Sequence, residues 1–170
     1  MAKDLIEEIP PLARWRFATQ AASLLPALYS RALREEEGTP EEREQAVWYA
    51  LGREVREVAE TFGFPTETAE EVCEVFRAGS VVLFGPDFRF SVLATSPERA
   101  TVVLKACPYT RCLTAAGCDA DTAFSWCLPF AVSAVEHLNP AFTLRFVRAR
   151  CMGEAQCEMT VRKKEEGEES

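Results

Sequence analysis

Apolar residues recur with a helical period through the first 79 residues of the chain. The first such stretch covers residues 11–38, and Pro26 lies inside it, where we expect a kink or a restart of the helix. A further helix is expected over residues 39–63, because Thr39 is a favourable N-cap. Another is expected over residues 66–78. These helices have acidic outer faces and no pattern of chemical groups, so we interpret them as structural.

The period of the pattern changes from 3.6 to 2 after Gly85. Residues 88–94 alternate between apolar and polar side chains, which predicts a half-buried strand. A turn and a second strand, residues 102–106, follow. The next segment, residues 107–117, reads as a loop that contains two cysteines.

A long helix is then expected to begin at Asp119 or Asp121 and to end at Leu138. Pro129 lies inside this helix and should kink it. Two further strands are expected over residues 142–150 and 157–162, with a cysteine-bearing turn between them.

This order of elements predicts an α+β fold. Residues 1–80 form a helical N-terminal half, and residues 81–162 form a cysteine-rich domain. In that domain the order strand–strand–helix–strand–strand indicates an antiparallel sheet packed on one long helix. The last residues, 163–170, are acidic and are predicted to be a disordered tail.

Charge and hydropathy narrow the classes of partner. The formal net charge is −8 and the isoelectric point is about 4.9, which argues against a nucleic-acid partner. No apolar run approaches the length of about 18 residues that crosses a bilayer, so no membrane partner is expected. The acidic N-terminus lacks an apolar signal core, which favours a cytoplasmic location.

The cysteines are unevenly distributed, since only one of the seven precedes residue 106. In a reducing cytosol, clustered cysteines are more often metal ligands or catalysts than disulfides, although disulfides stay open if a leader was removed. The six later cysteines are Cys107, Cys112, Cys118, Cys127, Cys151 and Cys157.

Four of these cysteines are predicted to converge. Cys151 and Cys157 end two facing strands, Cys107 closes an earlier strand, and Cys127 lies on the helix face that should cover the sheet. Four thiolates suit zinc or an iron–sulfur cluster. There is no CxxC pair, so independent cysteines remain an alternative, and Cys112 could replace Cys107 as a ligand.

A cysteine hydrolase is the other option from the residues. It needs a thiolate and usually a base. The single histidine, His137, lies about 15 Å from Cys127 along the same predicted helix, which is too far for a catalytic pair. A nucleophile here would therefore be activated by Arg148, Arg150 or another thiol.

Several short motifs carry a resemblance to known families. The chain resembles the L-2-amino-thiazoline-4-carboxylate hydrolase family over about residues 85–162, and it is also similar to the four-vinyl-reductase domain. The motifs are Cys107-Pro-Tyr, Trp126-Cys127, Asn139-Pro140, and the run from Arg148 through Gly153 to Cys157-Glu158-Met159.

The first resemblance implies hydrolysis of a small cyclic C–N bond with cysteine chemistry. The second implies binding of small organic ligands, in some members beside a zinc ion held by cysteines and an acidic side chain. Two expected acids are absent, because Phe130 and Arg148 stand at their positions. The chain also has an additional thiol, Cys151.

These observations lead us to a first hypothesis, a cytoplasmic protein with a sensor, binding or redox role. It would hold a metal or an iron–sulfur cluster through Cys107, Cys127, Cys151 and Cys157, beside a small-molecule pocket lined by Trp126. The alternative is a hydrolase with Cys157 or Cys107 as nucleophile and Arg148 orienting the substrate. A non-catalytic binding or interaction module is the third option. Burial of Trp15 and Tyr29 against a second subunit would make a homodimer.

Overall fold

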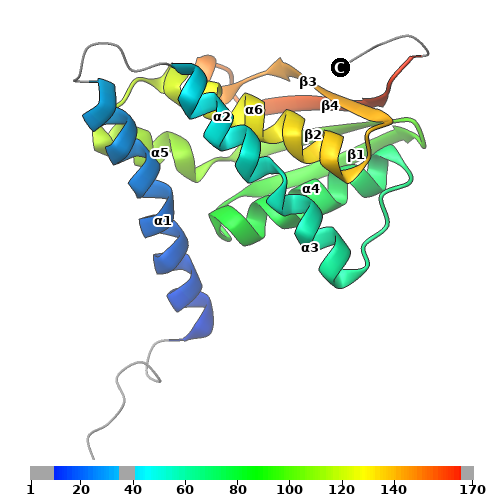
Figure 1. The fold of residues 1–170 in the computed structure, drawn as a ribbon, viewed down its shortest axis with the longest axis horizontal. Helices are drawn as coiled ribbons and strands as arrows, with labels where there is room; N and C mark the ends of the chain where they lie inside the picture. Colours follow the sequence, from blue (N-terminus) through cyan, green and yellow to red (C-terminus); the bar gives the residue numbers. More distant parts are fainter. Residues whose placement is uncertain (1–9, 35–40, 166–170) are drawn as a thin grey trace, which may run out of the picture.

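The computed structural model describes residues 10–34 and 41–165 (Figure 1). Thr39, predicted as an N-cap, lies outside these ranges, as does the end of the acidic tail, residues 166–170. The helices are α1 (Pro11–Arg34), α2 (Glu41–Gly52), α3 (Glu54–Phe62), α4 (Ala69–Phe84), α5 (Pro108–Ala116), α6 (Ala120–Leu138) and a short 3₁₀ helix, η1 (Arg150–Met152). The strands are β1 (Arg89–Ser96), β2 (Arg99–Ala106), β3 (Phe142–Arg148) and β4 (Cys157–Lys163).

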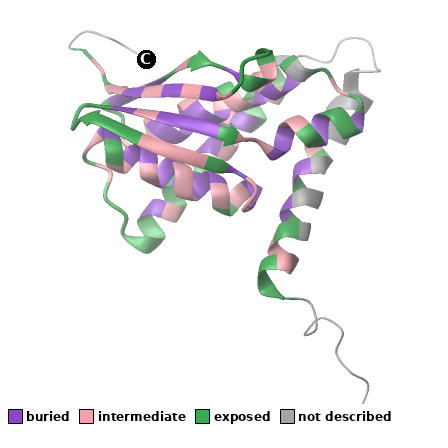
Figure 2. Cartoon of the chain, turned by 180° about the vertical axis from the view of Figure 1, so that it is seen from behind, coloured by how far each residue is buried: buried purple, intermediate pink, exposed green. Residues whose placement is uncertain are grey.

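The predicted α+β class is confirmed. The four strands form one antiparallel sheet in the order β1-β2-β4-β3, so the last strand in the sequence lies between β2 and β3. Helices α4 and α6 pack on one face of this sheet, and α2 and α3 pack on these two helices in turn (Figure 1). Seen from the other side, the sheet has no described helix over it (Figure 2).

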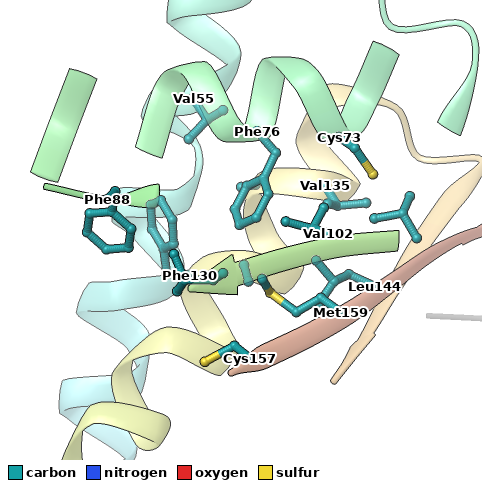
Figure 3. Packing of buried hydrophobic residues seen from close by; sticks show 14 of the residues in the cluster. Val55, Cys73, Phe76, Phe88, Val102, Phe130, Val135, Leu144, Cys157 and Met159 are labelled. Atoms are coloured by element: carbon teal, nitrogen blue, oxygen red, sulfur yellow. The ribbon is translucent and has the colours of Figure 1, made fainter. Parts of the chain in front are cut away.

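The core lies between the sheet and the helices that cover it. Alternate residues of the two central strands point into it, among them Val102 and Met159 (Figure 3). These two and their strand neighbours Leu104 and Val161 are nearly inaccessible to solvent. One continuous cluster of buried side chains joins α2, α3, α4, α5, α6 and the strands. The domain boundary expected at residue 80 falls inside α4, and both predicted parts contribute to this cluster.

Several predicted boundaries are wrong. The helix expected over residues 39–63 is divided into α2 and α3 at Gly52, where the chain passes close to α6: a Cβ atom there would lie 2.6 Å from the carbonyl oxygen of Phe130. By contrast, Pro26 and Pro129 each lie inside a helix that continues past them. The strand predicted to reach Arg150 ends at Arg148.

Helix α4 also differs from its prediction. It begins at Ala69 after the capping box of Thr68 and Glu71, and it continues to Phe84 instead of ending at Ala78. Gly85 follows with φ +100°, a conformation that favours glycine, and any side chain there would collide with Thr19 of α1.

Candidate thiol site at one end of the sheet

Strand register determines where Cys157 lies. Cys157 pairs with Leu104 of β2 and shares the inward-facing side of β4 with Met159 and Val161 (Figure 3). The side chain is 5% exposed, as the period-2 pattern predicts. Cys107 follows shortly after Leu104, just beyond the end of β2. The strand pairing therefore brings residues that are distant in the sequence to one end of the sheet.

Cys107 is the N-cap of α5, a helix that the sequence reading missed. Pro108 occupies the first helical position, and Gly117 ends the helix in the left-handed conformation with its N–H directed to Leu113 and Thr114. Pro108 and Gly117 are the residues in the sequence that indicate this helix. Because Cys107 stands at the N-terminus, the backbone of Tyr109 and Thr110 forms hydrogen bonds that lower the pKa of its thiol.

Burial nevertheless dominates the acidity of Cys107. Desolvation is the largest influence and leaves its pKa above the ordinary thiol value, in spite of the backbone hydrogen bonds and the positive charge of Arg150. Burial likewise raises the pKa of Cys127 and of Cys157, and it raises the pKa of Cys151 to about 11. All four side chains are therefore neutral thiols at pH 7.

The structure brings the four cysteines into electrostatic range of one another. A negative charge on Cys107 raises the pKa of the other three, Cys151 and Cys157 raise the pKa of Cys127, and Cys157 raises that of Cys151. The seven cysteines all lie in the described ranges, and none of them is in a disulfide. Within the described ranges, however, no group of three or more His, Cys, Asp or Glu side chains is arranged to hold a metal ion. The hypothesis of a zinc or iron–sulfur site therefore gains no support.

Arg150 connects the two halves of the site. Its backbone N–H donates to Cys157 Sγ at 3.2 Å, and its guanidinium Nη1 donates to the carbonyl oxygen of Lys105 at 2.6 Å. The second bond joins η1 to the end of β2, next to Cys107. The first bond and the charge of Arg150 both lower the pKa of Cys157.

A surface cavity of about 580 Å³ opens beside Cys107. Three basic side chains line it, those of Lys105, Arg111 and Arg150, and the described residues that line it include no carboxylate. Arg111 forms an ion pair with Asp87, which does not line the cavity, and the distance between Nη2 and Oδ2 is 3.4 Å. The cavity therefore combines an accessible thiol with positive charge, in a chain whose net charge is −8.

The other residues singled out from the sequence lie elsewhere. Arg148 is on β3, does not line this cavity, and its Nε lies 3.9 Å from Glu158 Oε2. Trp126 is fully buried, stacks on Trp48, and leaves its indole N–H without a hydrogen-bond partner. The Nδ1 atom of His137 lies 2.7 Å from the carbonyl oxygen of Ser133, within α6 and far along the helix from Cys127.

Two neighbours complete the site: Tyr109, which was not assigned to it from the sequence, and Cys112, which was considered only as a ligand that could replace Cys107. Tyr109 is buried beside the thiols, and its pKa is raised well above the usual value by burial and by the charges of Cys127, Cys107 and Cys112. Cys112 lies on α5 within electrostatic range of Cys107. Both follow from the existence of α5, so recognition of that helix would have placed them.

A second, interior cavity lies on the core side of Cys127. It is lined by Cys127, Ser80 and large apolar side chains including Phe84 and Phe130, and its volume is about 20 Å³. Ser80 is 1% exposed and its hydroxyl has no hydrogen-bond partner. The space suffices for about one water molecule.

Comparisons with known proteins place these observations in context. A family model described as L-2-amino-thiazoline-4-carboxylic acid hydrolase matches residues 16–161, which includes most of the helical half that the sequence motifs did not require. No curated protein matches the chain. No described helix is both long and apolar enough to span a membrane.

One similar solved structure is trafficking protein particle complex subunit 3 from Naegleria fowleri, covalently bound to palmitic acid. The TM-score is 0.56 at 13% sequence identity, and the match covers 88% of this chain and 96% of that chain. At this identity the likeness concerns the fold alone.

Proposed function

The chain belongs to the L-2-amino-thiazoline-4-carboxylic acid hydrolase family, and from this premise we propose that it hydrolyses a C–N bond of a small cyclic carboxylate. The single observation that carries the proposal is the position of Cys107. It is a thiol at a helix N-terminus that lines a cavity with three basic side chains. A substrate carboxylate would bind Arg111 or Arg150, since guanidinium groups bind carboxylates with well-defined geometry.

Access favours Cys107 over Cys157 and Cys127 as the nucleophile. Cys157 is buried and its sulfur accepts the hydrogen bond from the backbone of Arg150. Cys127 faces the interior cavity. Cys107 lines the cavity that opens to solvent.

The neutral state of the thiol fits the reaction. In the first step Cys107 Sγ bonds to the ring carbon between the two nitrogens, and the thiol proton passes to the ring nitrogen. The bond from this carbon to the ring nitrogen then breaks, as a second proton moves from the 2-amino group to the departing nitrogen. Water adds to the carbon, the bond to Cys107 Sγ breaks, and a proton from the water returns to that sulfur, so the product has gained one water. The backbone N–H groups at the start of α5 stabilise negative charge on the thiolate as the proton leaves.

The fatty acid of the structural neighbour gives a second ligand class to consider. The interior cavity beside Cys127 is apolar, and at about 20 Å³ it is far too small for a long acyl chain. This volume favours a small ring at Cys107 over an acyl chain at Cys127.

A metal or iron–sulfur role for Cys107, Cys127, Cys151 and Cys157 stays an untested prediction. Metal analysis of anaerobically purified protein, with an absorption spectrum near 400 nm as the sign of a cluster, separates it from the hydrolase. We expect hydrolysis to continue unchanged after dialysis against a chelator, because the proposed steps use only the thiol, the guanidinium groups and water.

The decisive experiment incubates the full chain with L-2-amino-thiazoline-4-carboxylic acid and follows the gain of one water by mass spectrometry. Cys107→Ser should lower the rate by about 10³-fold or more, since a hydroxyl is a much weaker nucleophile here. Cys118→Ser is the matched control and should retain full activity, because Cys118 does not line the cavity. Full activity in Cys107→Ser would exclude Cys107 as the nucleophile. No turnover by the wild type would exclude this substrate.

A further inference from the structure

Helix α1 exposes large apolar side chains. Among the α1 residues whose side chains the structure describes, Thr19 and Ser23 are buried, whereas Leu25 and Tyr29 are 54% and 67% exposed. An amphipathic helix normally buries its large apolar residues, so these two side chains are available to a partner. The body contacts of α1 are mainly with α5, together with the ion pair between Arg16 and Asp87.

Its position in the molecule is equally unusual. The beginning of α1 extends beyond the rest of the protein in both views (Figures 1 and 2). Leu12, near this end, is 54% exposed. Large apolar side chains on a projecting helix are typical of a surface that a partner covers.

The charge of α1 is opposite to that of the whole chain. The helix contains four arginines and no acidic residue, whereas the chain as a whole has a net charge of −8. The four are Arg14, Arg16, Arg31 and Arg34. A partner for this helix should therefore offer apolar contacts and negative charge.

Such a surface exists on the same molecule. A groove of about 610 Å³ follows the outer face of α6 between α2 and η1. Its apolar wall contains Phe124, Leu128, Val132 and Met152, with Leu128 and Met152 exposed. Asp121 lines one end, and no basic side chain is among the described residues that line it.

The spacing of this wall suits a helix. Phe124, Leu128 and Val132 recur at intervals of four along α6, so they form one ridge that a second helix can pack against. Helix-in-groove recognition of this kind uses apolar anchors one turn apart. Leu25 and Tyr29 of α1 have the same four-residue spacing.

We propose that this groove receives α1 of a second copy of the chain, in a reciprocal dimer with two such contacts. Pairing of α1 with α1 of the partner is disfavoured, because it would bring two helices with four arginines each together. Docking into the groove instead places α1, which carries arginines and no acidic residue, beside the carboxylate of Asp121. Each copy supplies one helix and one groove, which closes the assembly at two.

The test is sedimentation equilibrium of the full chain and two double variants. A helix variant, Leu25→Asp with Tyr29→Asp, and a groove variant, Leu128→Asp with Met152→Asp, should each raise the dimer dissociation constant by about 30-fold or more. All four positions are exposed, so circular dichroism should show an unchanged fold. Phe62→Asp, at an exposed aromatic residue of α3, is the control and should dimerise like the wild type.

Mixing the two variants makes the test specific. A mixed pair keeps one intact contact, between the normal helix of the groove variant and the normal groove of the helix variant. The mixture should therefore form dimers that neither variant forms alone. A monomeric wild type, dimers that persist in both variants, or a mixture that stays monomeric would each overturn the proposal.

Discussion

Two kinds of thiol in this protein differ both in their exposure and in their neighbours. Cys73 of α4 is inaccessible in the core, and burial raises its pKa to about 12. Cys107 is also desolvated, but backbone N–H groups of α5 and the charge of Arg150 act against that effect. The thiol that we propose as the nucleophile thus differs from a core thiol by donors and cations that can stabilise its anion. Burial alone describes a small hydrophobe.

The largest difference should appear in chemical reactivity. Iodoacetamide should alkylate Cys107 at least about 100-fold faster than Cys73, because Cys73 reacts only after local unfolding. Peptide mass spectrometry over time measures both rates in one sample. The rate at Cys107 should rise about tenfold per pH unit between pH 7 and pH 9, since its raised pKa keeps the thiolate a minor species there. A rate that is flat over this range would show that the pKa of Cys107 is low.

A smaller effect is expected from the removal of Arg150, the cation that lies near Cys107 and not near Cys73. Arg150→Ala should lower kcat/KM for L-2-amino-thiazoline-4-carboxylic acid by about tenfold to 100-fold, mainly through KM, because it removes a carboxylate partner from the cavity. Arg148→Ala is the matched control, since Arg148 lies outside the cavity and contacts Glu158. Equal losses in the two variants would mean that general positive charge, and not Arg150, binds the substrate.

The smallest effect should come from the core thiol. Cys73→Ser places a hydroxyl among apolar side chains and should lower the free energy of unfolding by about 1–2 kcal/mol, while kcat/KM stays unchanged. Urea denaturation measures the first quantity and the hydrolysis assay the second. A loss of activity in the folded variant would remove the distinction between the two kinds of thiol.

The sequence was sufficient for the existence of four strands and their antiparallel arrangement, but it did not predict the strand order β1-β2-β4-β3. The inward direction of Cys157 followed from the alternation along β4. The sequence was insufficient for α5. This segment was predicted as a loop with two cysteines, although Pro108 and Gly117 begin and end a helix there.

Trp126 shows a different limit. A tryptophan beside a candidate site suggests a ligand contact, but here it fills the core against Trp48. Periodicity assigns a residue to a helix face, and only the packing of α2 on α6 decides what covers that face. The preference for Arg150 over Arg148 is of the same kind, since it depends on the end of β3 and the turn of η1.

The insertion of β4 between β2 and β3 has a consequence for the order of events during folding. Leu104 and Cys157 meet only when β4 pairs with β2, a contact between distant parts of the chain that forms slowly. A nascent polypeptide emerging from the ribosome would thus carry Cys107 without its companion thiols, and chemical competence would arrive with the final step of assembly.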